Sequence, residues 1–578
     1  MLHNLFPHAR YHFPTEVAGA VRRRGGVATK NSNPPPAHQT LVVSETMRIS
    51  TINYPKRLQV AALPEDLETA LRTLTTNARI NNLDGDRLEI EAPFTGETIG
   101  WVASGTEEDV EEAFRFARRA QASWRHVPFS QRRQIFRRFH DLVLRHKELL
   151  SDMVQLETGK NRASAFDEVL DVANNARYYS NNVEKFMSPE SRRSALAVLA
   201  KSKEYRHPLG VVGQISPWNY PLALGVGDAI PALLAGNGLV AKPDSATPFT
   251  SLLVFSLLFD AGLPRDLVQL VTGSGRVVGS AIADRCDFLM FTGSTKTGKV
   301  LGEQVGKRLV GYSAELGGKN PMIVANDADL EYTARGAVDG CFSNSGQLCV
   351  SVERIYVERA SYAEFERLFT QRVKAMSLGG GFNYEVQMGS LASQDQLDTV
   401  TSYVDDAVSK GARVLAGGKA RPDLGPYFYE PTVLTDVPED AKLRTEEVFG
   451  PVVFLEAVGS LEEAVEKAND TSYGLNASIF AAPKTAWRIA PKVESGALAI
   501  NDGYTAAWAA IGNPMGGRKE SGVSHRHGEE GLTKYTASQN ITEQRFMSIR
   551  GPESLSRKAY ANVMAGALRA GKVFKVLP

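Results

Sequence analysis

The sequence contains one cysteine whose neighbours suit nucleophilic chemistry. In the segment Phe342-Ser-Asn-Ser-Gly-Gln-Leu-Cys349, glycine and small polar residues come just before the thiol. This composition favours a turn that presents Cys349 to a cleft over a helix that buries it. Once deprotonated, a cysteine can attack an aldehyde and form a thiohemiacetal. Cys286 and Cys341 have apolar neighbours, which predicts that both are inert packing residues.

A carboxylate that could serve as a base comes earlier in the chain. In the segment Glu315-Leu-Gly-Gly-Lys-Asn-Pro321, the carboxylate ends an apolar run that predicts a strand, and two glycines follow. Glycines let a ligand approach the backbone closely. A carboxylate in such a place can act as a general base toward water. Glu315 is therefore the candidate base.

Two further features could bind a nucleotide. Phe291-Thr-Gly-Ser-Thr-Lys-Thr-Gly298 follows a predicted strand and opens a predicted helix, and free amides at a helix N-terminus attract phosphate. Its spacing is not the G-x-G-x-x-G pattern, so a plain strand-to-helix turn stays open. Lys242, at the end of the predicted strand Leu239-Val-Ala, could bond ribose hydroxyls, and a solvated lysine is the alternative.

These segments resemble the aldehyde dehydrogenase superfamily when further motifs are added. The added motifs are Ile215-Ser-Pro-Trp-Asn-Tyr-Pro221, Lys242-Pro, Glu447-Val-Phe-Gly-Pro451 and Pro514-Met-Gly-Gly. All occur in family order and spacing, and the resemblance covers about residues 75 to 545. Separated motifs that agree with one another support the assignment together more strongly than each does alone.

The resemblance implies a role for each matching residue. Cys349 would be the nucleophile, and Asn219 with the Cys349 backbone amide would form the oxyanion hole. Glu315 would activate the water that hydrolyses the thioester. Lys242 and Glu447 would hold the two riboses, and no metal is expected. The full expected cofactor set is Trp218, Asn219, Lys242, Ser245, Gly293, Ser294, Leu316, Glu447 and Phe449, with Ser294 at the pyrophosphate, Phe449 near the nicotinamide and Trp218 in the same groove.

The cofactor preference is predicted from one position. Relatives that prefer NAD commonly carry a glutamate three positions after the lysine, where it repels a 2'-phosphate. Here that position is Ser245, which is small and neutral and can donate a hydrogen bond. We therefore expect NADP to be accepted and preferred, with NAD as the other cofactor.

The motifs are most similar to NADP-dependent succinic-semialdehyde dehydrogenases, but this chain departs from that pattern. Gly227 and Ser343 stand where better-known members carry arginines for the substrate carboxylate. Either another cation supplies the charge or the aldehyde is a different one. Asp228 and Arg526 stand where many relatives have a lysine and a glutamate, which predicts a different proton relay from Glu315.

Other functions stay open at this point. An aromatic or medium-chain aldehyde would suit a substrate mouth built from Tyr220, Phe342, Tyr504 and Trp508, although these could equally be core residues. A CoA-acylating relative would use the same cysteine, but Glu315 favours hydrolysis. An inactive binding member would have lost the nucleophile. A papain-like hydrolase would need a histidine base, and none occurs between residues 207 and 525.

The composition limits which binding partners and which cellular compartment are expected. The 66 basic and 65 acidic residues nearly cancel, so no global field favours nucleic acid or an anionic membrane. A small-molecule aldehyde is the expected partner. Three cysteines are too few for a disulfide framework, which predicts a reducing, cytoplasmic setting.

Alternating strands and helices predict an α/β protein with a Rossmann-like cofactor domain, an α/β catalytic domain and a small β oligomerisation arm. The parallel sheet is expected to draw its strands from the apolar runs between Val211 and Val324. An apolar patch at residues 196–200 suggests a strand or hairpin whose edge pairs with another subunit, hence a homodimer or homotetramer. A basic segment from Arg557 onward could form an amphipathic helix, with membrane contact not expected. The expected domains are an extension at 1–59, a cofactor domain at 60–189 and 208–314, an arm at 190–207 and 524–545, a catalytic domain at 315–523 and a C-terminal extension at 546–578.

Overall fold

The computed structural model describes residues 71–82, 85–194, 199–546, 548 and 550–574. The extension expected at residues 1–59 lies outside the described residues, and so does most of the apolar patch 196–200.

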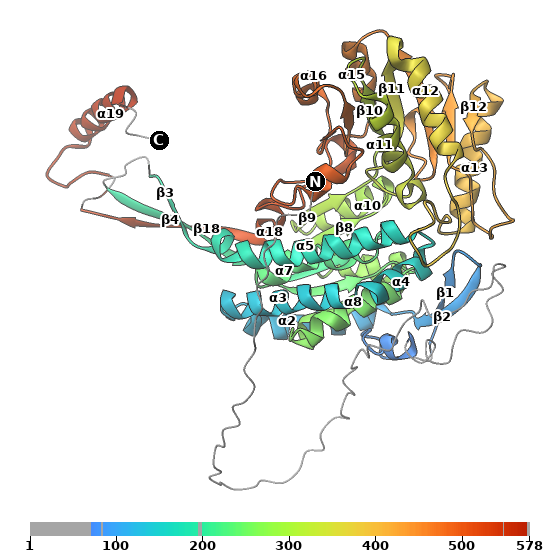
Figure 1. Ribbon diagram of the computed structural model, residues 1–578. Helices are drawn as coiled ribbons and strands as arrows, with labels where there is room; N and C mark the ends of the chain where they lie inside the picture. Colours follow the sequence, from blue (N-terminus) through green and yellow to red (C-terminus); the bar gives the residue numbers. More distant parts are fainter. Residues whose placement is uncertain (1–70, 83–84, 195–198, 547, 549, 575–578) are drawn as a thin grey trace, which may run out of the picture. The chain divides into compact units, whose positions relative to one another are not determined.

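A six-stranded sheet forms the expected Rossmann-like part (Figure 1). Its order is β17-β9-β8-β5-β6-β7, with every pair parallel except β17 with β9. The carboxyl ends of the parallel strands meet at one edge, where ligands bind in such sheets. The strands are β5 (Val211–Ile215), β6 (Gly238–Lys242), β7 (Val268–Leu270), β8 (Phe288–Thr292), β9 (Gly311–Glu315) and β17 (Gly522–Val523).

Two differences from the expected strand grouping appear at the end of this sheet. The run Pro321–Val324 belongs to β10 (Asn320–Val324), which lies in the other large sheet, so the prediction of one sheet from 211 to 324 is wrong for its last strand. Conversely, β17 pairs with β9, with Gly522 opposite Glu315. A short connection after Glu315, which contains Gly317 and Gly318, takes the chain from the first sheet to the second.

Both faces of the six-stranded sheet are buried. Along β8, Phe288 and Met290 join one hydrophobic cluster, whereas Leu289 and Phe291 join another on the opposite face. This alternation follows from the two-residue period of a strand, and covered parallel sheets are apolar on both sides. The helices of this half are α2 (Glu107–Trp124), α3 (Phe129–Arg145), α4 (Lys147–Thr158), α5 (Arg162–Met187), α6 (Ala223–Val226), α7 (Ala229–Leu234), α8 (Pro248–Asp260), α9 (Ser280–Ala283) and α10 (Thr295–Gly306).

A seven-stranded sheet carries the predicted nucleophile segment. Its order is β12-β13-β14-β11-β10-β15-β16, parallel except for β12 with β13. The remaining strands are β11 (Val352–Glu358), β12 (Arg413–Ala416), β13 (Thr432–Thr435), β14 (Val452–Val458), β15 (Ser478–Phe480) and β16 (Ala499–Ile500). The helices are α11 (Leu330–Phe342), α12 (Arg359–Lys374), α13 (Gln394–Ser409), α14 (Lys442–Thr445), α15 (Leu461–Asn469), α16 (Pro483–Ile489) and α17 (Thr505–Ala509). The short helix α18 (Glu530–Thr533) packs instead on α5 and α7 of the first half.

A three-stranded antiparallel sheet stands where the arm is expected. The strands β3 (Glu190–Arg192), β4 (Ala200–Pro208) and β18 (Thr536–Gln544) lie in the order β18-β4-β3 (Figure 1). Eight of the nine residues of β18 are exposed, so its outer edge is open to another chain. Near the start of the described chain, β1 (Arg87–Ala92) and β2 (Glu97–Ala103) form a separate hairpin.

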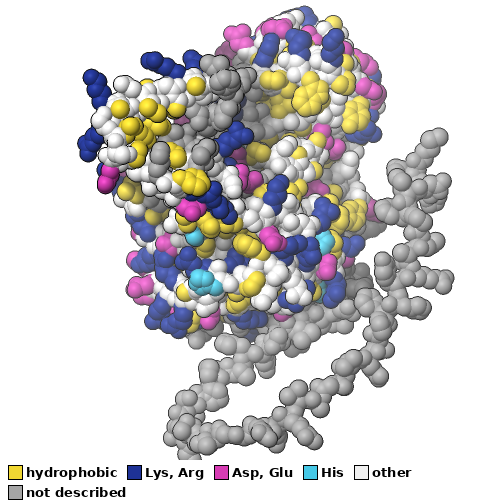
Figure 2. Space-filling model, turned by 90° about the vertical axis from the view of Figure 1, so that its left-hand side faces the viewer, with side chains coloured by type: hydrophobic (Ala, Val, Ile, Leu, Met, Phe, Trp, Pro, Cys, Tyr) yellow, Lys and Arg dark blue, Asp and Glu magenta, His cyan; other side chains and the backbone are white. Residues whose placement is uncertain are grey.

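The C-terminal segment contains the predicted helix, α19 (Arg557–Phe574). Among the described residues, no helix combines the length and the apolar character needed to cross a bilayer. Basic and acidic side chains are interspersed over the face drawn in Figure 2, as the small net charge predicts.

Candidate active site

The nucleophile segment forms a sharp turn, as predicted. After α11 ends at Phe342, Asn344, Ser345 and Gly346 adopt positive φ angles of 52°, 56° and 70°. Such angles are unusual for residues other than glycine. A side chain at Gly346 would collide with the Gly450 carbonyl, because its Cβ would lie 2.1 Å from that oxygen. The turn therefore depends on glycine at this position.

Cys349 is the partly exposed cysteine of the chain, whereas Cys286 and Cys341 are buried. Its backbone is held from the neighbouring sheet, since Asn320 Nδ2 donates to the carbonyls of Cys349 and Ser351 at 2.7 Å each. The sulfur is thus presented to a cavity by a fixed main chain.

Asn219 lies beside the nucleophile segment. Its side-chain amide donates to the Gln347 carbonyl at 3.0 Å, two residues before Cys349. Asn219 follows β5 at the carboxyl edge of the six-stranded sheet, so the structure brings the two predicted residues together from different sheets. An amide has two N–H groups, and the second is available for an oxyanion.

A buried ion pair fixes the loop that carries Asn219. Lys160 donates to Glu168 at 2.6 Å and to the Asn219 carbonyl at 2.7 Å. Glu168 in turn accepts the backbone N–H groups of Leu222 and Ala223. Both charged side chains are fully buried. Sequence reasoning missed this pair, because Lys160 lies 59 residues before Asn219 and no local pattern marks it.

Glu315 ends β9 and is buried. Burial raises its pKa to about 7, although the nearby cations Arg526 and Lys534 limit the rise. One carboxylate oxygen, Oε1, has no hydrogen-bond partner among the described residues. A half-ionised carboxylate with a free oxygen suits a general base near neutral pH.

Burial also raises the pKa of the Cys349 thiol, to about 12, with the Arg526 charge opposing the rise. The thiol therefore carries its proton at neutral pH in this structure. A base must remove that proton before the sulfur can attack.

The two residues that depart from the family pattern contact each other. Arg526 Nη2 donates to Asp228 at 2.6 Å and to the Thr292 hydroxyl at 2.7 Å. Lys534 also lies 3.9 Å from Asp228. Asp228 stands at the position of the expected lysine, and Arg526 at the position of the expected glutamate. The two positions therefore still hold one acid and one base, but the acid and the base have changed places.

The predicted phosphate and ribose residues lie at the carboxyl edge of the six-stranded sheet. Lys242 is buried at the end of β6. Its Nζ donates a hydrogen bond to the Pro243 carbonyl. Ser294 caps α10 by accepting the Thr297 N–H, while Gly293 precedes it as a turn residue. Ser245 donates its hydroxyl to the Gly273 carbonyl at 3.0 Å, so it would have to rotate to donate to a phosphate.

The other side of the groove comes from the seven-stranded half. Glu447 accepts the Gly318 N–H at 2.8 Å, and burial raises the Glu447 pKa to about 8. Phe449 meets Trp218 edge to face, with ring centroids 5.6 Å apart. Leu316, which follows Glu315 directly, packs against Gly298 of α10.

A second buried pair holds the Glu447 loop. Glu353 accepts a hydrogen bond from Lys319 and the backbone N–H groups of Val448 and Phe449. Sequence reasoning missed Glu353, whereas Lys319 lay within a recognised motif without a role.

A cavity of about 50 Å³ opens at Cys349. Tyr220 and Trp508, predicted for the substrate mouth, both line it, with ring centroids 5.4 Å apart. Tyr504 packs on Trp508 and lines neighbouring cavities. Phe342 stacks on Phe369 inside the core and lines a neighbouring cavity, so the core alternative holds for this residue.

Known proteins are similar to this chain over most of its length. A family profile described as "Aldehyde dehydrogenase family" matches residues 81–541. A Mycolicibacterium smegmatis protein named "Putative succinate-semialdehyde dehydrogenase", with NADP(+) in its name, is 50% identical over 83% of this chain and 93% of its own length. The mitochondrial succinate-semialdehyde dehydrogenase of Arabidopsis thaliana is 35% identical over 79% of this chain and 86% of its length.

Solved structures share the fold. A Staphylococcus aureus betaine aldehyde dehydrogenase in complex with NAD+ matches with a TM-score of 0.77 and 34% identity, over 84% of this chain and 99% of that one. A structure described as an NADP dependent enzyme of E. coli matches with a TM-score of 0.76 and 32% identity, over 79% and 95%.

Proposed function

The chain belongs to the aldehyde dehydrogenase family, and from that membership we propose that it oxidises succinate semialdehyde to succinate with NADP through a thioester on Cys349. The proposal rests on the arrangement of three groups around one cavity. The partly exposed Cys349 thiol lies at the cavity, the Asn219 amide bonds the turn before it, and the Glu315 carboxylate, whose pKa is raised, lies nearby. Nucleophile, oxyanion donor and base are the groups that this oxidation requires.

The first half of the reaction joins the substrate to the protein. Glu315 accepts the Cys349 proton, which the raised thiol pKa makes necessary. The sulfur then bonds the carbonyl carbon, and the oxygen takes the electron pair of the C=O bond. Asn219 Nδ2 and the Cys349 backbone N–H donate to that oxygen.

The second half releases the acid. A bound nicotinamide supplies the acceptor for the hydride that the carbonyl carbon must lose. Glu315 releases its first proton to solvent and then takes one from water. The resulting hydroxide oxygen bonds the thioester carbon, the C–S bond breaks with its electron pair going to sulfur, and the Cys349 thiolate regains a proton from Glu315. A buried base of this kind supports hydrolysis over transfer to CoA.

The residues at the sheet edge fit a nicotinamide dinucleotide. Lys242 is a buried ammonium with donor capacity left for ribose hydroxyls or a phosphate. Gly317 leaves a narrow cradle beside Glu447, since a Cβ there would lie 2.2 Å from the carboxylate. The N-terminus of α10, with Ser294 as its cap, suits the pyrophosphate. Ser245, which lacks a negative charge, supports NADP over NAD.

The substrate proposal draws on relatives and on the cavity. The names of the M. smegmatis and A. thaliana proteins both specify succinate semialdehyde. A cavity of about 50 Å³ holds only a few water-sized groups, which favours a compact aldehyde. A small aromatic aldehyde is the second candidate, because the rings of Tyr220 and Trp508 line the same wall.

We also propose that the protein works in the cytoplasm as a homodimer or homotetramer. The three cysteines are unpaired, as in a reducing compartment, and the exposed edge of β18 is suited to pairing between subunits. Size-exclusion chromatography with light scattering would test the oligomeric state.

The testing experiment is a spectrophotometric assay of NADPH and NADH formation with succinate semialdehyde, pentanal and benzaldehyde. We expect succinate semialdehyde with NADP to give the highest kcat/KM. Cys349→Ala should abolish activity, whereas the matched Cys341→Ala, in the core, should retain it. Activity that survives in Cys349→Ala, or a requirement for CoA, would overturn the mechanism.

A further inference from the structure

The inner end of the Cys349 cavity carries polar atoms without partners. Among the described residues, Tyr179 Oη, Arg526 Nε and His527 Nδ1 are buried and make no hydrogen bond. All three side chains line this cavity. Buried polar groups are normally paired, so three unpaired atoms on side chains that line one cavity indicate a polar ligand or ordered water there.

Arg526 has donor capacity left after its structural contacts are counted. Nη2 is bound to Asp228 and Thr292. Nε keeps an N–H without an acceptor. A guanidinium stays charged at any physiological pH and is well suited to carboxylates. Its side chain is 15% exposed and lines the Cys349 cavity.

The local charge balance also leaves room for an anion. Two cations, Arg526 and Lys534, share the carboxylate of Asp228, and Glu315, the other acid near both cations, is only partly ionised near neutral pH because burial raises its pKa to about 7. Asp171, the other acid on the cavity wall, accepts the Trp508 N–H, and burial raises its pKa to about 7. Below that pH, Asp171 adds little negative charge to oppose a substrate carboxylate.

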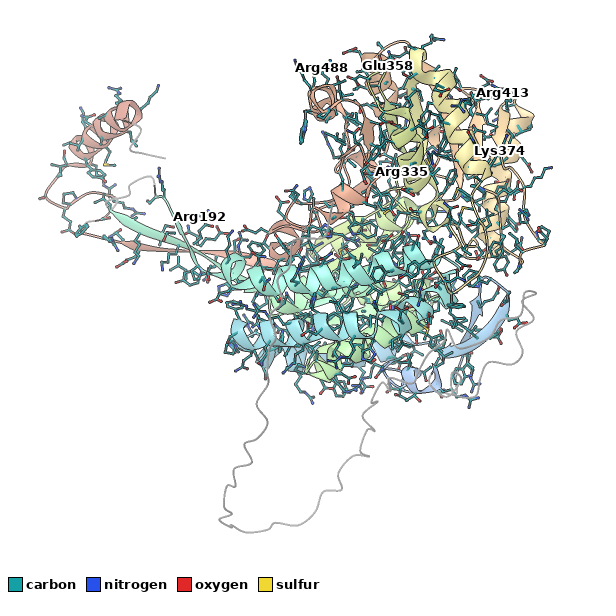
Figure 3. All side chains as sticks on the ribbon, viewed as in Figure 1. Arg192, Arg335, Glu358, Lys374, Arg413 and Arg488 are labelled. Atoms are coloured by element: carbon teal, nitrogen blue, oxygen red, sulfur yellow. The ribbon has the colours of Figure 1, made fainter. Side chains whose placement is uncertain are left out.

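Arg526 has no competing cation among the cavity-lining residues that the structure describes. Arg526 is the one lysine or arginine among the described residues that line the Cys349 cavity. Gly227 lines the cavity without a side chain, and Ser343 lines a different cavity, together with the exposed Arg335 of α11 (Figure 3).

The geometry points to Arg526, with Tyr179 and His527, as the subsite for the distant carboxylate of a short semialdehyde whose carbonyl carbon lies at Cys349. This inference rests on the proposed function and deepens it, since it names the group that selects an acidic aldehyde. His527 suits this role as a neutral donor, because burial lowers its pKa to about 4. The subsite would supply the cation that Gly227 and Ser343 lack.

The test compares succinate semialdehyde with pentanal, which has an uncharged ethyl group in place of the carboxylate. In Arg526→Met, kcat/KM for succinate semialdehyde should fall by about 30-fold or more, mainly through KM, as expected for a lost charge-assisted hydrogen bond. The value for pentanal should fall less, because pentanal oxidation loses only the effect of the Arg526 charge on the pKa values of Glu315 and Cys349. Arg335→Met is the matched control, and its substrate preference should stay that of the wild type.

A second variant controls for misfolding, because Arg526→Met removes the cation that pairs with the buried Asp228. Arg526→Met/Asp228→Asn removes both charges and should show the same selective loss, with thermal unfolding followed in parallel. An equal loss on both substrates, or a selective loss in Arg335→Met instead, would overturn the subsite.

Failure of the proposed function would look different. If the wild type does not prefer succinate semialdehyde to pentanal, the proposed substrate is wrong. The subsite is then tested by butyrate as an inhibitor of pentanal oxidation. Inhibition of the wild type that is lost in Arg526→Met supports an anion subsite, and equal inhibition or none in both proteins refutes it.

Discussion

The indole nitrogen of Trp508 donates a hydrogen bond to Asp171 across 2.7 Å. Asp171 lies on the long helix α5, whereas Trp508 lies on α17, a five-residue helix without a side-chain cap. Both residues line the Cys349 cavity and also the neighbouring cavity of about 170 Å³. The bond therefore spans the junction of the two cavities and anchors a short helix to a long one.

We predict that Trp508→Phe destabilises the protein by about 1–2 kcal/mol, because a buried carboxyl loses its donor. Burial raises the Asp171 pKa to about 7 and the Trp508 bond opposes that rise, so the variant's pKa should be higher still. A raised carboxyl pKa gives stability that is present below the unfolded value, near 4, and is lost as pH rises through 7. The decrease in the free energy of unfolding caused by Trp508→Phe, measured with urea, should thus be larger at pH 8 than at pH 6. Equal losses at both values would contradict this, and Asp171→Asn/Trp508→Phe should remove the pH dependence.

The pH dependence of turnover should report Glu315. Its pKa is raised to about 7, and a general base must be ionised to act, so kcat should rise with pH and level off above about 7. Glu315→Gln should lower kcat by about 100-fold or more and remove this inflection. The measurement is a kcat profile from pH 5.5 to 9 under saturating NADP and aldehyde. A profile in Glu315→Gln that keeps the wild-type inflection would exclude Glu315 as its source.

Residues at the ends of strands were predictable from the sequence, because strand pattern and motif coincide there. Glu315, Lys242 and Ser294 each follow a short apolar run, and the parallel order brings all three to one sheet edge. The turn before Cys349 was equally predictable, because glycine and small polar residues are typical of turns.

The groups that support these residues were not predictable. Lys160 and Glu353 act on loops that lie 59 and 95 residues away along the chain, and each reads as an ordinary charged residue in its own segment. For Phe342 the sequence leaves open a place at the substrate mouth or in the core, and only the structure shows that it packs into the core. Contacts between sheets depend on tertiary packing, which local pattern does not encode.

The Lys319–Glu353 pair should be important for both folding and cofactor binding. Lys319→Met leaves the Glu353 carboxylate buried and without a cation, which costs about 3–5 kcal/mol in comparable cases. Because Glu353 also holds the N–H groups of Val448 and Phe449, NADP binding should weaken as well. Urea unfolding and fluorescence titration with NADP measure the two effects. Lys307→Met, which removes an exposed pair, is the control and should change neither. Wild-type stability in Lys319→Met would refute the role of the pair.

Cofactor preference should turn on Ser245. Its hydroxyl donates to the Gly273 carbonyl, so it places no negative charge where a 2'-phosphate would lie beside Lys242. Ser245→Glu introduces that charge, and the ratio of kcat/KM with NADP to that with NAD should fall at least tenfold, or about 1.4 kcal/mol. Ser245→Gln adds similar volume without charge and should lower the ratio less. Initial rates with each nucleotide at saturating aldehyde measure the ratio. If Ser245→Glu and Ser245→Gln shift it equally, bulk and not charge controls the choice, and an unchanged ratio in both would place the 2'-phosphate away from this residue.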